Sequence, residues 1–229
     1  MAYYRPPSTI LLASTSPRRR ELVARLKIPF ESCSPSGVEE LPYSNEDPAG
    51  YVDRMSTLKA LSTAKSVGNN RLVIGSDTAV TIGGAILGKP SDVLEAESML
   101  RFLRGKTHQV VTSVTLVSTD MNKVLTRNSA ISVTMRNYSD LEINEYIATG
   151  DAMDKAGAYA IQHEGFDPVS RLYGCYTSVV GLPLCILSLQ LAEMGFDLQQ
   201  IPCGSGPDAR NFVSSFYDAR NLGESGKSL

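Results

Sequence analysis

The sequence has few of the residues that build zinc centres or histidine-based catalytic relays. Its 229 residues include two histidines, His108 and His163, and four cysteines, at positions 33, 175, 185 and 203. These residues form no C-x-x-C pair and show no zinc-finger spacing, which argues against a zinc site and against a Ser-His-Asp relay. We expect the cysteines to be reduced thiols in a cytoplasmic protein, with Cys185 in the core.

The sequence also lacks an excess of charge of one sign and any long apolar run. Its 22 basic and 24 acidic residues give a net charge of -2, too balanced for a broad basic field that would hold nucleic acid or an anionic membrane. The apolar stretch 179–189 is interrupted by Gly181, Pro183 and Ser188 and is too short to span a bilayer. Residues 1–7 contain no apolar core of a secretory signal. We therefore expect a cytoplasmic protein that binds neither nucleic acid nor a membrane.

Two familiar phosphate-binding loops are missing as well. Gly105, Lys106 and Thr107 resemble the end of a G-x-x-x-x-G-K-[ST] loop, but Leu100 stands where its first glycine would be. The G-x-G-x-x-G pattern does not occur either. A nucleotide bound by this chain would need another kind of cradle.

The most informative segment present is residues 11–20, LLASTSPRRR. Ser16 suits an N-cap and Pro17 the first position of a helix. Three arginines then occupy the first turn, where the positive end of the helix dipole favours anions and disfavours cations. A phosphate chain would meet free N–H groups, serine hydroxyls and guanidinium groups there. The alternative is a solvated basic turn in which Ser16 acts only as a cap.

The order of predicted elements favours an α/β fold. Strands are expected at 9–13, 29–34, 72–75 with an extended continuation through 79–82, 108–117 and 124–135. Helices are expected at 17–26, 48–67, 92–103, 139–148 and 183–195. Because βα units mix with a hairpin, we predict a mixed twisted sheet with flanking helices, in two lobes around a cleft. We expect residues 1–204 to form one domain and 205–229 a C-terminal tail.

Several polar residues are candidates for chemistry. Asp77 follows an apolar strand, in the place where α/β sheets gather ligands, and could bind Mg²⁺ or orient water; a turn aspartate is the alternative. The loop residues Glu39 and Glu40 could add a metal ligand or could form a solvated pair. Lys59 and Lys89 could reach a phosphate or lie on the surface. Gln162 could recognise a base edge, and Arg171 is a weaker phosphate candidate.

Taken together, these segments resemble the Maf family of nucleoside triphosphate pyrophosphatases. The matching stretches follow the family's order over roughly residues 9 to 200. They are LASTSPRR (12–19), EE (39–40), KA (59–60), GSDT (75–78), GKP (88–90), GKTHQV (105–110), DKAGAYAIQ (154–162) and VVGLPL (179–184).

The resemblance implies a fold related to the inosine triphosphate pyrophosphatases and cleavage between the α- and β-phosphates. It implies a divalent metal (Mg²⁺, Mn²⁺ or Co²⁺), held near Asp77 and Glu40, and often a homodimer. Asp77 matches the family's catalytic proton acceptor. The other matched positions concern the substrate: Ser14, Ser16, Arg18, Arg19, Lys59 and Lys89 lie in its phosphate-binding stretches. Arg18, Thr78 and Gln162 match the branch that acts on dTTP and UTP rather than on 7-methyl-GTP.

The sequence therefore predicts a hydrolase, a nucleoside triphosphate pyrophosphatase. Its expected substrates are dTTP, UTP and modified pyrimidine nucleotides, cleaved to the monophosphate and pyrophosphate in nucleotide-pool housecleaning. Two alternatives remain open at this point. One is a nucleotide-binding regulator of cell division with little turnover, and the other is a phosphatase that removes the terminal phosphate.

Overall fold

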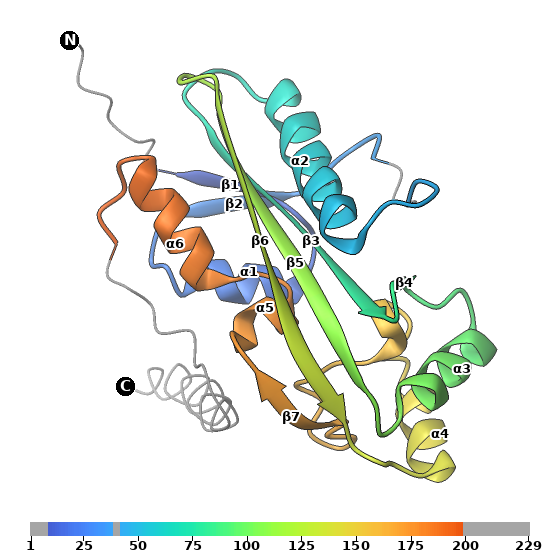
Figure 1. Ribbon diagram of the computed structural model, residues 1–229. Helices are drawn as coiled ribbons and strands as arrows, with labels where there is room; N and C mark the ends of the chain where they lie inside the picture. Colours follow the sequence, from blue (N-terminus) through green and yellow to red (C-terminus); the bar gives the residue numbers. More distant parts are fainter. Residues whose placement is uncertain (1–8, 39–41, 199–229) are drawn as a thin grey trace, which may run out of the picture.

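The chain folds around a seven-stranded mixed sheet in the computed structural model, which describes residues 9–38 and 42–198 (Figure 1). The strand order is β2 (Phe30–Cys33), β1 (Ile10–Ala13), β3 (Leu72–Ile82), β5 (Thr107–Ser118), β6 (Lys123–Met135) and β7 (Val169–Tyr173). The short strand β4 (Ala85–Leu87) pairs with β3 through a hairpin at Gly83 and Gly84. Pairing is parallel between β1 and each of β2 and β3, and antiparallel between β3 and β5, β5 and β6, and β6 and β7. The prediction of a mixed α/β fold is confirmed.

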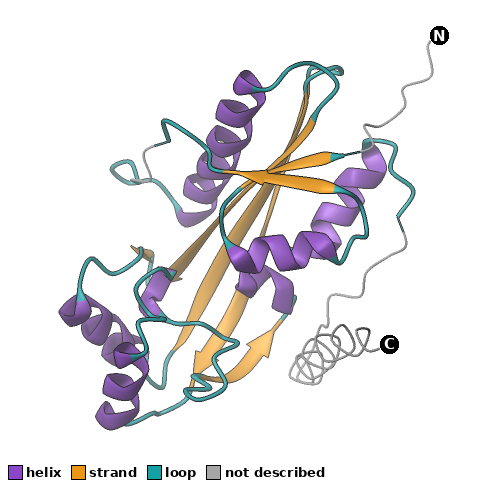
Figure 2. Cartoon of the chain, turned by 180° about the vertical axis from the view of Figure 1, so that it is seen from behind, coloured by secondary structure: helices purple, strands orange, loops and turns teal. Residues whose placement is uncertain are grey.

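The parallel end of the sheet is covered by helices on both faces. Helices α1 (Pro17–Ala24) and α6 (Leu184–Glu193) cover one face, where Ile10, Leu12 and Ile74 are buried (Figures 1 and 2). Helix α2 (Pro48–Ser66) covers the opposite face over Leu11 and Val73. Burial on both faces explains why β1 and the first part of β3 are continuous apolar runs rather than alternating ones.

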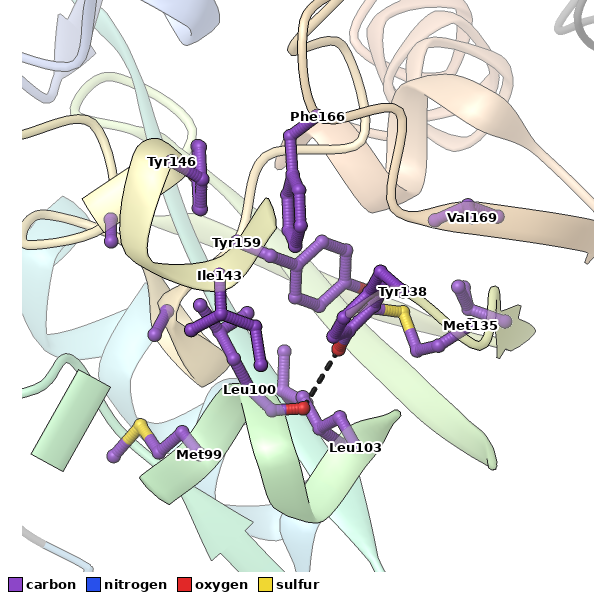
Figure 3. Packing of buried hydrophobic residues seen from close by; sticks show 14 of the residues in the cluster. Met99, Leu100, Leu103, Met135, Tyr138, Ile143, Tyr146, Tyr159, Phe166 and Val169 are labelled. Atoms are coloured by element: carbon purple, nitrogen blue, oxygen red, sulfur yellow. Dashed lines mark hydrogen bonds between the residues drawn. The ribbon is translucent and has the colours of Figure 1, made fainter. Parts of the chain in front are cut away.

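A second core lies at the other end of the long strands β3, β5 and β6. Helices α3 (Val93–Leu103) and α4 (Asp140–Ala148) and the 3-10 turn η1 (Ala156–Ala158) pack there around a cluster rich in aromatic rings (Figure 3). Tyr138, Tyr146, Tyr159 and Phe166 are all at most 5% exposed. The long strands thus carry two cores, and the space between the two sets of helices and loops is where a cleft forms.

Most predicted elements are confirmed to within a few residues, but three were missed. The missed elements are η1, β7 and the short helix α5 (Tyr176–Val180). All three lie in the stretch between α4 and α6, where the apolar residues show no regular helical or strand spacing. Residues 39–41 and the predicted tail 205–229 lie outside the described residues. None of the helices within 9–38 and 42–198 is long and apolar enough to cross a membrane.

Two predictions need correction. Asp77 does not follow a strand: β3 is one continuous strand over Leu72–Ile82, and Asp77 lies in its middle. The parallel partner β1 pairs only as far as Ile74, so Asp77 still stands just beyond the carboxyl edge of the parallel part of the sheet. The expectation of four reduced cysteines is also wrong, because Cys185 is disulfide-bonded while Cys33 and Cys175 are free. Disulfide pairing depends on proximity in the fold, which sequence spacing does not show.

Candidate active site

The start of α1 forms one side of a cavity. Ser16 is the N-cap, and its Oγ accepts a hydrogen bond from the backbone N–H of Arg19 at 3.5 Å. Ser14 Oγ accepts from the N–H of Ser16 at 3.2 Å, so both predicted serines shape the turn between β1 and the helix. The first turn of α1 contains no acidic residue. The positive end of the helix, with Arg18 and Arg19, therefore faces the cavity without an anion from the same turn.

The three arginines of this turn have different surroundings. Arg19 donates from Nε to the Gly181 carbonyl at 2.9 Å and from Nη2 to Thr78 Oγ1 at 3.3 Å, which ties α1 to β3 and to the end of α5. Arg18 is half-buried and lines the cavity. Arg20 is exposed and is not among the lining residues.

The buried ion pair of Lys59 and Asp77 lies deeper in the cavity. Lys59 Nζ donates to Asp77 Oδ1 at 2.6 Å, and the two residues are 5% and 6% exposed. Losing one partner of such a pair leaves an uncompensated buried charge, which typically costs about 3–5 kcal/mol. The pair therefore fixes the position of the carboxylate with respect to α2.

Gly75 makes this pairing possible by letting α2 lie directly on β3. A Cβ atom built on Gly75 would be 2.2 Å from the Ser56 carbonyl oxygen and 2.8 Å from the Ala60 nitrogen. Ser56 Oγ also shares a hydrogen bond of 2.8 Å with Thr115 Oγ1, which holds the helix against β5. Lys59, one turn along the helix from Ser56, is thereby placed over Asp77.

The opposite side of the cavity consists of two loops. Lys89 lies two residues after β4, and residues 154–162 lie between α4 and β7 and include η1 and Gln162. The N–H of Gly157 donates to the Gly88 carbonyl at 3.0 Å and joins the two loops. Gly157 has φ of 68°, in the left-handed region that favours glycine.

Lys155 is the buried centre of this second side. It is 7% exposed, and its Nζ donates to the Asp151 carbonyl at 2.5 Å, to Asp151 Oδ1 at 2.7 Å and to Asp154 Oδ1 at 2.5 Å. Burial acts to raise the pKa of Asp154, but the hydrogen bond from Lys155 and the charges of Lys155 and Arg18 outweigh it and lower that pKa. The charge of Arg18 thus acts across the cavity on the opposite side.

The two sides enclose about 630 Å³, a volume in the range of small-molecule sites. All but one of the predicted site residues line this cavity, namely Ser14, Ser16, Arg18, Arg19, Lys59, Asp77, Thr78, Lys89 and Gln162. The exception, Glu40, lies outside the described residues with Glu39. Arg171 is exposed on β7 and is not a lining residue, so the structure does not bring this candidate to the cavity.

Among the lining residues without a role assigned from the sequence are Asp154, Lys155 and Tyr159. Tyr159 Oη shares a hydrogen bond of 2.7 Å with Nε2 of buried His108, and burial lowers the pKa of His108 to about 4. The stretch DKAGAY that contains the three residues was part of the family resemblance. Asp154 and Lys155 are adjacent in this stretch, but only the fold shows that Lys155 is buried and that it also pairs with Asp151.

The donor set allows a divalent metal that is shared with a ligand. Among residues 9–38 and 42–198, no three His, Cys, Asp or Glu side chains gather as a metal site. Of the two carboxylates among the described lining residues, Asp77 and Asp154, it is Asp77 that forms the buried pair with Lys59. Mg²⁺ is commonly bound by one or two carboxylates together with substrate phosphates, and the residues present fit that arrangement rather than an all-protein cage.

The fold and the cavity together define an α/β protein with a cationic cleft suited to a polyphosphate. The sequence profile of the family described as Maf-like protein matches residues 9–194, and the chain belongs to this family.

Curated relatives cover most of the chain. A dTTP/UTP pyrophosphatase of Dictyoglomus thermophilum is 41% identical over 189 residues, 82% of this chain and 97% of that protein. One from Moorella thermoacetica is 41% identical over 191 residues, 83% of this chain and 97% of that protein. A solved nucleoside-triphosphatase / dITP/XTP pyrophosphatase of Mycobacterium abscessus is 16% identical with a TM-score of 0.40, covering 95% of this chain and 99% of that one.

Proposed function

We propose that this protein is a nucleoside triphosphate pyrophosphatase that hydrolyses dTTP, UTP and modified pyrimidine nucleotides to the monophosphate and pyrophosphate. The observation that carries the proposal is the gathering of Arg18, Arg19, Lys59 and Lys89 around Asp77 in one cavity. Several cations around one carboxylate suit a polyphosphate that is attacked by water. The names of relatives at about 40% identity support the choice of dTTP and UTP.

In the proposed reaction, the triphosphate lies against the first turn of α1. Arg18 and the helix amides bind its oxygens, and Lys59 and Lys89 neutralise further charge. Asp77, held in place by Lys59, accepts a proton from a water molecule that attacks the α-phosphorus. The bond from the water oxygen to the α-phosphorus forms as the bond to the bridging oxygen breaks, and pyrophosphate leaves with the electron pair.

We further propose that Asp77 and Glu40 hold a divalent cation (Mg²⁺, Mn²⁺ or Co²⁺) together with the triphosphate. Such a cation, when bound, supplies charge neutralisation on the phosphate oxygens. The chemistry of the donor set supports this, because a carboxylate and phosphate oxygens are the ligands such cations prefer. A homodimer, a cytoplasmic location and nucleotide-pool housecleaning stay predictions from the family resemblance.

The test is a panel of standard and modified nucleoside triphosphates incubated with the purified protein and Mg²⁺. We expect pyrophosphate and monophosphate from dTTP and UTP, with little product from purine nucleotides. Release of inorganic phosphate and a diphosphate would instead identify a terminal phosphatase. Tight binding of dTTP without product would identify a nucleotide-binding regulator, and either result would contradict the proposal.

A further inference from the structure

The segment that carries Gln162 is anchored by two tyrosine hydroxyls. Tyr159, which belongs to this segment, shares a hydrogen bond with His108 on β5. Tyr146 lies on α4, and its Oη accepts a hydrogen bond from the backbone N–H of Ala160 in the segment at 3.1 Å. Tyr146 is 2% exposed and Ala160 is 3% exposed, so water does not readily replace this bond.

The hydroxyl of Tyr146 also belongs to a longer chain of contacts. It donates to Asp151 Oδ2 at 3.1 Å, and the other oxygen of Asp151 accepts from Lys155. Lys155 in turn lines the cavity. The phenol thus connects the backbone just before Gln162 with the ion pairs of buried Lys155 on the same side of the cavity.

A glutamine needs such anchoring if it is to select a base. Its amide can accept from N3–H of thymine or uracil while donating to O4, but after a rotation of the amide it can donate to N3 of cytosine and accept from N4–H. The side chain alone is therefore compatible with both bases. A fixed backbone at Gln162 limits where its side-chain amide can lie relative to the base, and selection between the two bases depends on that placement.

We infer that Tyr146 is a positioning residue for nucleobase selection, whose hydroxyl fixes the segment before Gln162. The inference rests on the proposed function, since it assumes that Gln162 faces the base of a bound nucleotide. The hydroxyl can be separated from the ring, because the ring has packing partners of its own. It stacks on Phe166, with ring centroids 4.4 Å apart and planes 8° apart, and meets His163 edge-on. Figure 3 shows Tyr146 beside Phe166 in the aromatic cluster.

The decisive variant is Tyr146→Phe, which keeps the ring and removes both hydrogen bonds. Its matched control is Tyr138→Phe in the same cluster. Tyr138 is 1% exposed, and its hydroxyl donates to the Leu100 carbonyl of α3 at 2.8 Å, a bond marked in Figure 3, rather than to the backbone of the Gln162 segment. Both variants lose a buried hydroxyl, so both should show a lower melting temperature.

Selectivity distinguishes the two variants. The readout is the ratio of kcat/KM for dTTP to that for dCTP. We expect Tyr146→Phe to lower this ratio about tenfold, the size of effect that one misplaced polar contact produces, with kcat for dTTP within about threefold of the wild type. Tyr138→Phe should leave the ratio unchanged. Equal losses for both nucleotides in both variants would overturn the inference, because they would show a general effect of destabilisation.

A second variant and a second measurement keep the test informative. Asp151→Asn removes the charge that joins Tyr146 to Lys155, and it should lower the ratio in the same direction by about threefold. If the wild type releases no pyrophosphate from either nucleotide, the proposed function fails. In that case the ratio of dissociation constants for dTTP and dCTP, measured by calorimetry on the same variants, decides the inference, and an unchanged ratio overturns it.

Discussion

One side of the cavity is built on regular elements, whereas the other is an irregular stretch between α4 and β7. On the first side, β1, β3, α1 and α2 place Ser16, Arg18, Lys59 and Asp77 through caps, strand pairing and one close helix–sheet contact. On the second side, buried Lys155 holds the loop through its hydrogen bonds to Asp151 and Asp154. The positions of the side chains are set by backbone geometry on the first side and by polar contacts of a buried lysine on the second.

Each side also has its own buried lysine, and the two carboxylates beside them differ in exposure. The Asp77 side chain is 9% exposed, whereas that of Asp154 is 68% exposed. Buried charges interact more strongly than solvated ones because the surrounding dielectric constant is lower. They also need little reorganisation when a new charge develops beside them in the transition state. We therefore assign the chemistry to the first side and ligand positioning to the second, and the following variants test this division.

The largest effect is expected for Asp77→Asn. Because the amide cannot accept the proton of the attacking water, the metal-dependent rate should fall by about 10³-fold or more. The rate of pyrophosphate release from dTTP measures this, and circular dichroism should show a folded protein. The same change on the other side, Asp154→Asn, should lower kcat by no more than about threefold. Near-normal turnover by Asp77→Asn would remove Asp77 from its proposed role.

The next effect concerns the contact that places Lys59. Gly75→Ala puts a methyl group against the backbone of α2, so the helix must shift, at a cost of about 3 kcal/mol. We expect a melting temperature lower by roughly 6–12 °C, together with a lower kcat. Gly68→Ala is the control, since a Cβ at Gly68 meets nothing within 4 Å. A stable, fully active Gly75→Ala variant would show that α2 can move away without loss.

The free energy of unfolding should depend on pH through His108, the buried hydrogen-bond partner of Tyr159 on the second side. Burial lowers the pKa of His108 from 6.5 to about 4 in the folded protein. The stability tied to its neutral form is therefore present above about pH 6.5, the pKa expected when unfolded, and is lost as pH falls toward 4. The full loss is about 3 kcal/mol. Urea unfolding between pH 7 and pH 5 should show this slope, and His108→Gln should flatten it; an equal slope in both proteins would contradict the assignment.

The smallest effect separates two neighbouring arginines. Arg18→Ala should lower kcat/KM for dTTP about tenfold, as expected for one charge-assisted contact to a phosphate. Arg20→Ala should change it by less than about twofold, because Arg20 is exposed and does not line the cavity. Equal effects of the two variants would indicate a general influence of positive charge rather than a defined contact.

Much of the first side could be predicted from local rules. Pro17 and Ser16 mark the start of α1, and the cation-rich first turn indicates an anion site, because capping and dipole effects act within a few residues. Asp77 was singled out by its place next to an apolar strand. Its position within a continuous strand was missed, because the sequence does not show that β1 stops pairing with β3 at Ile74.

The second side could not be derived in this way. Gln162 and Lys89 were candidates from their residue types, but only the family resemblance gave them matched positions, and nothing local predicted that Lys155 would be buried. Lys155 can be buried because Asp151 and Asp154 form ion pairs with it in the folded chain. Tyr146 on α4 adds a hydrogen bond to Asp151. Polar residues of this kind do not recur at a regular spacing, so the sequence does not predict which partners they bind.

By itself, the sequence determined the α/β class, the helix starts and a family whose members carry this set of charged residues. These depend on the period of apolar residues and on short motifs, which act locally. Only the tertiary structure decided that Lys59 pairs with Asp77 and that Tyr146 holds the segment before Gln162. Each of these joins residues from different elements, and such contacts arise only when the folded chain brings those elements together.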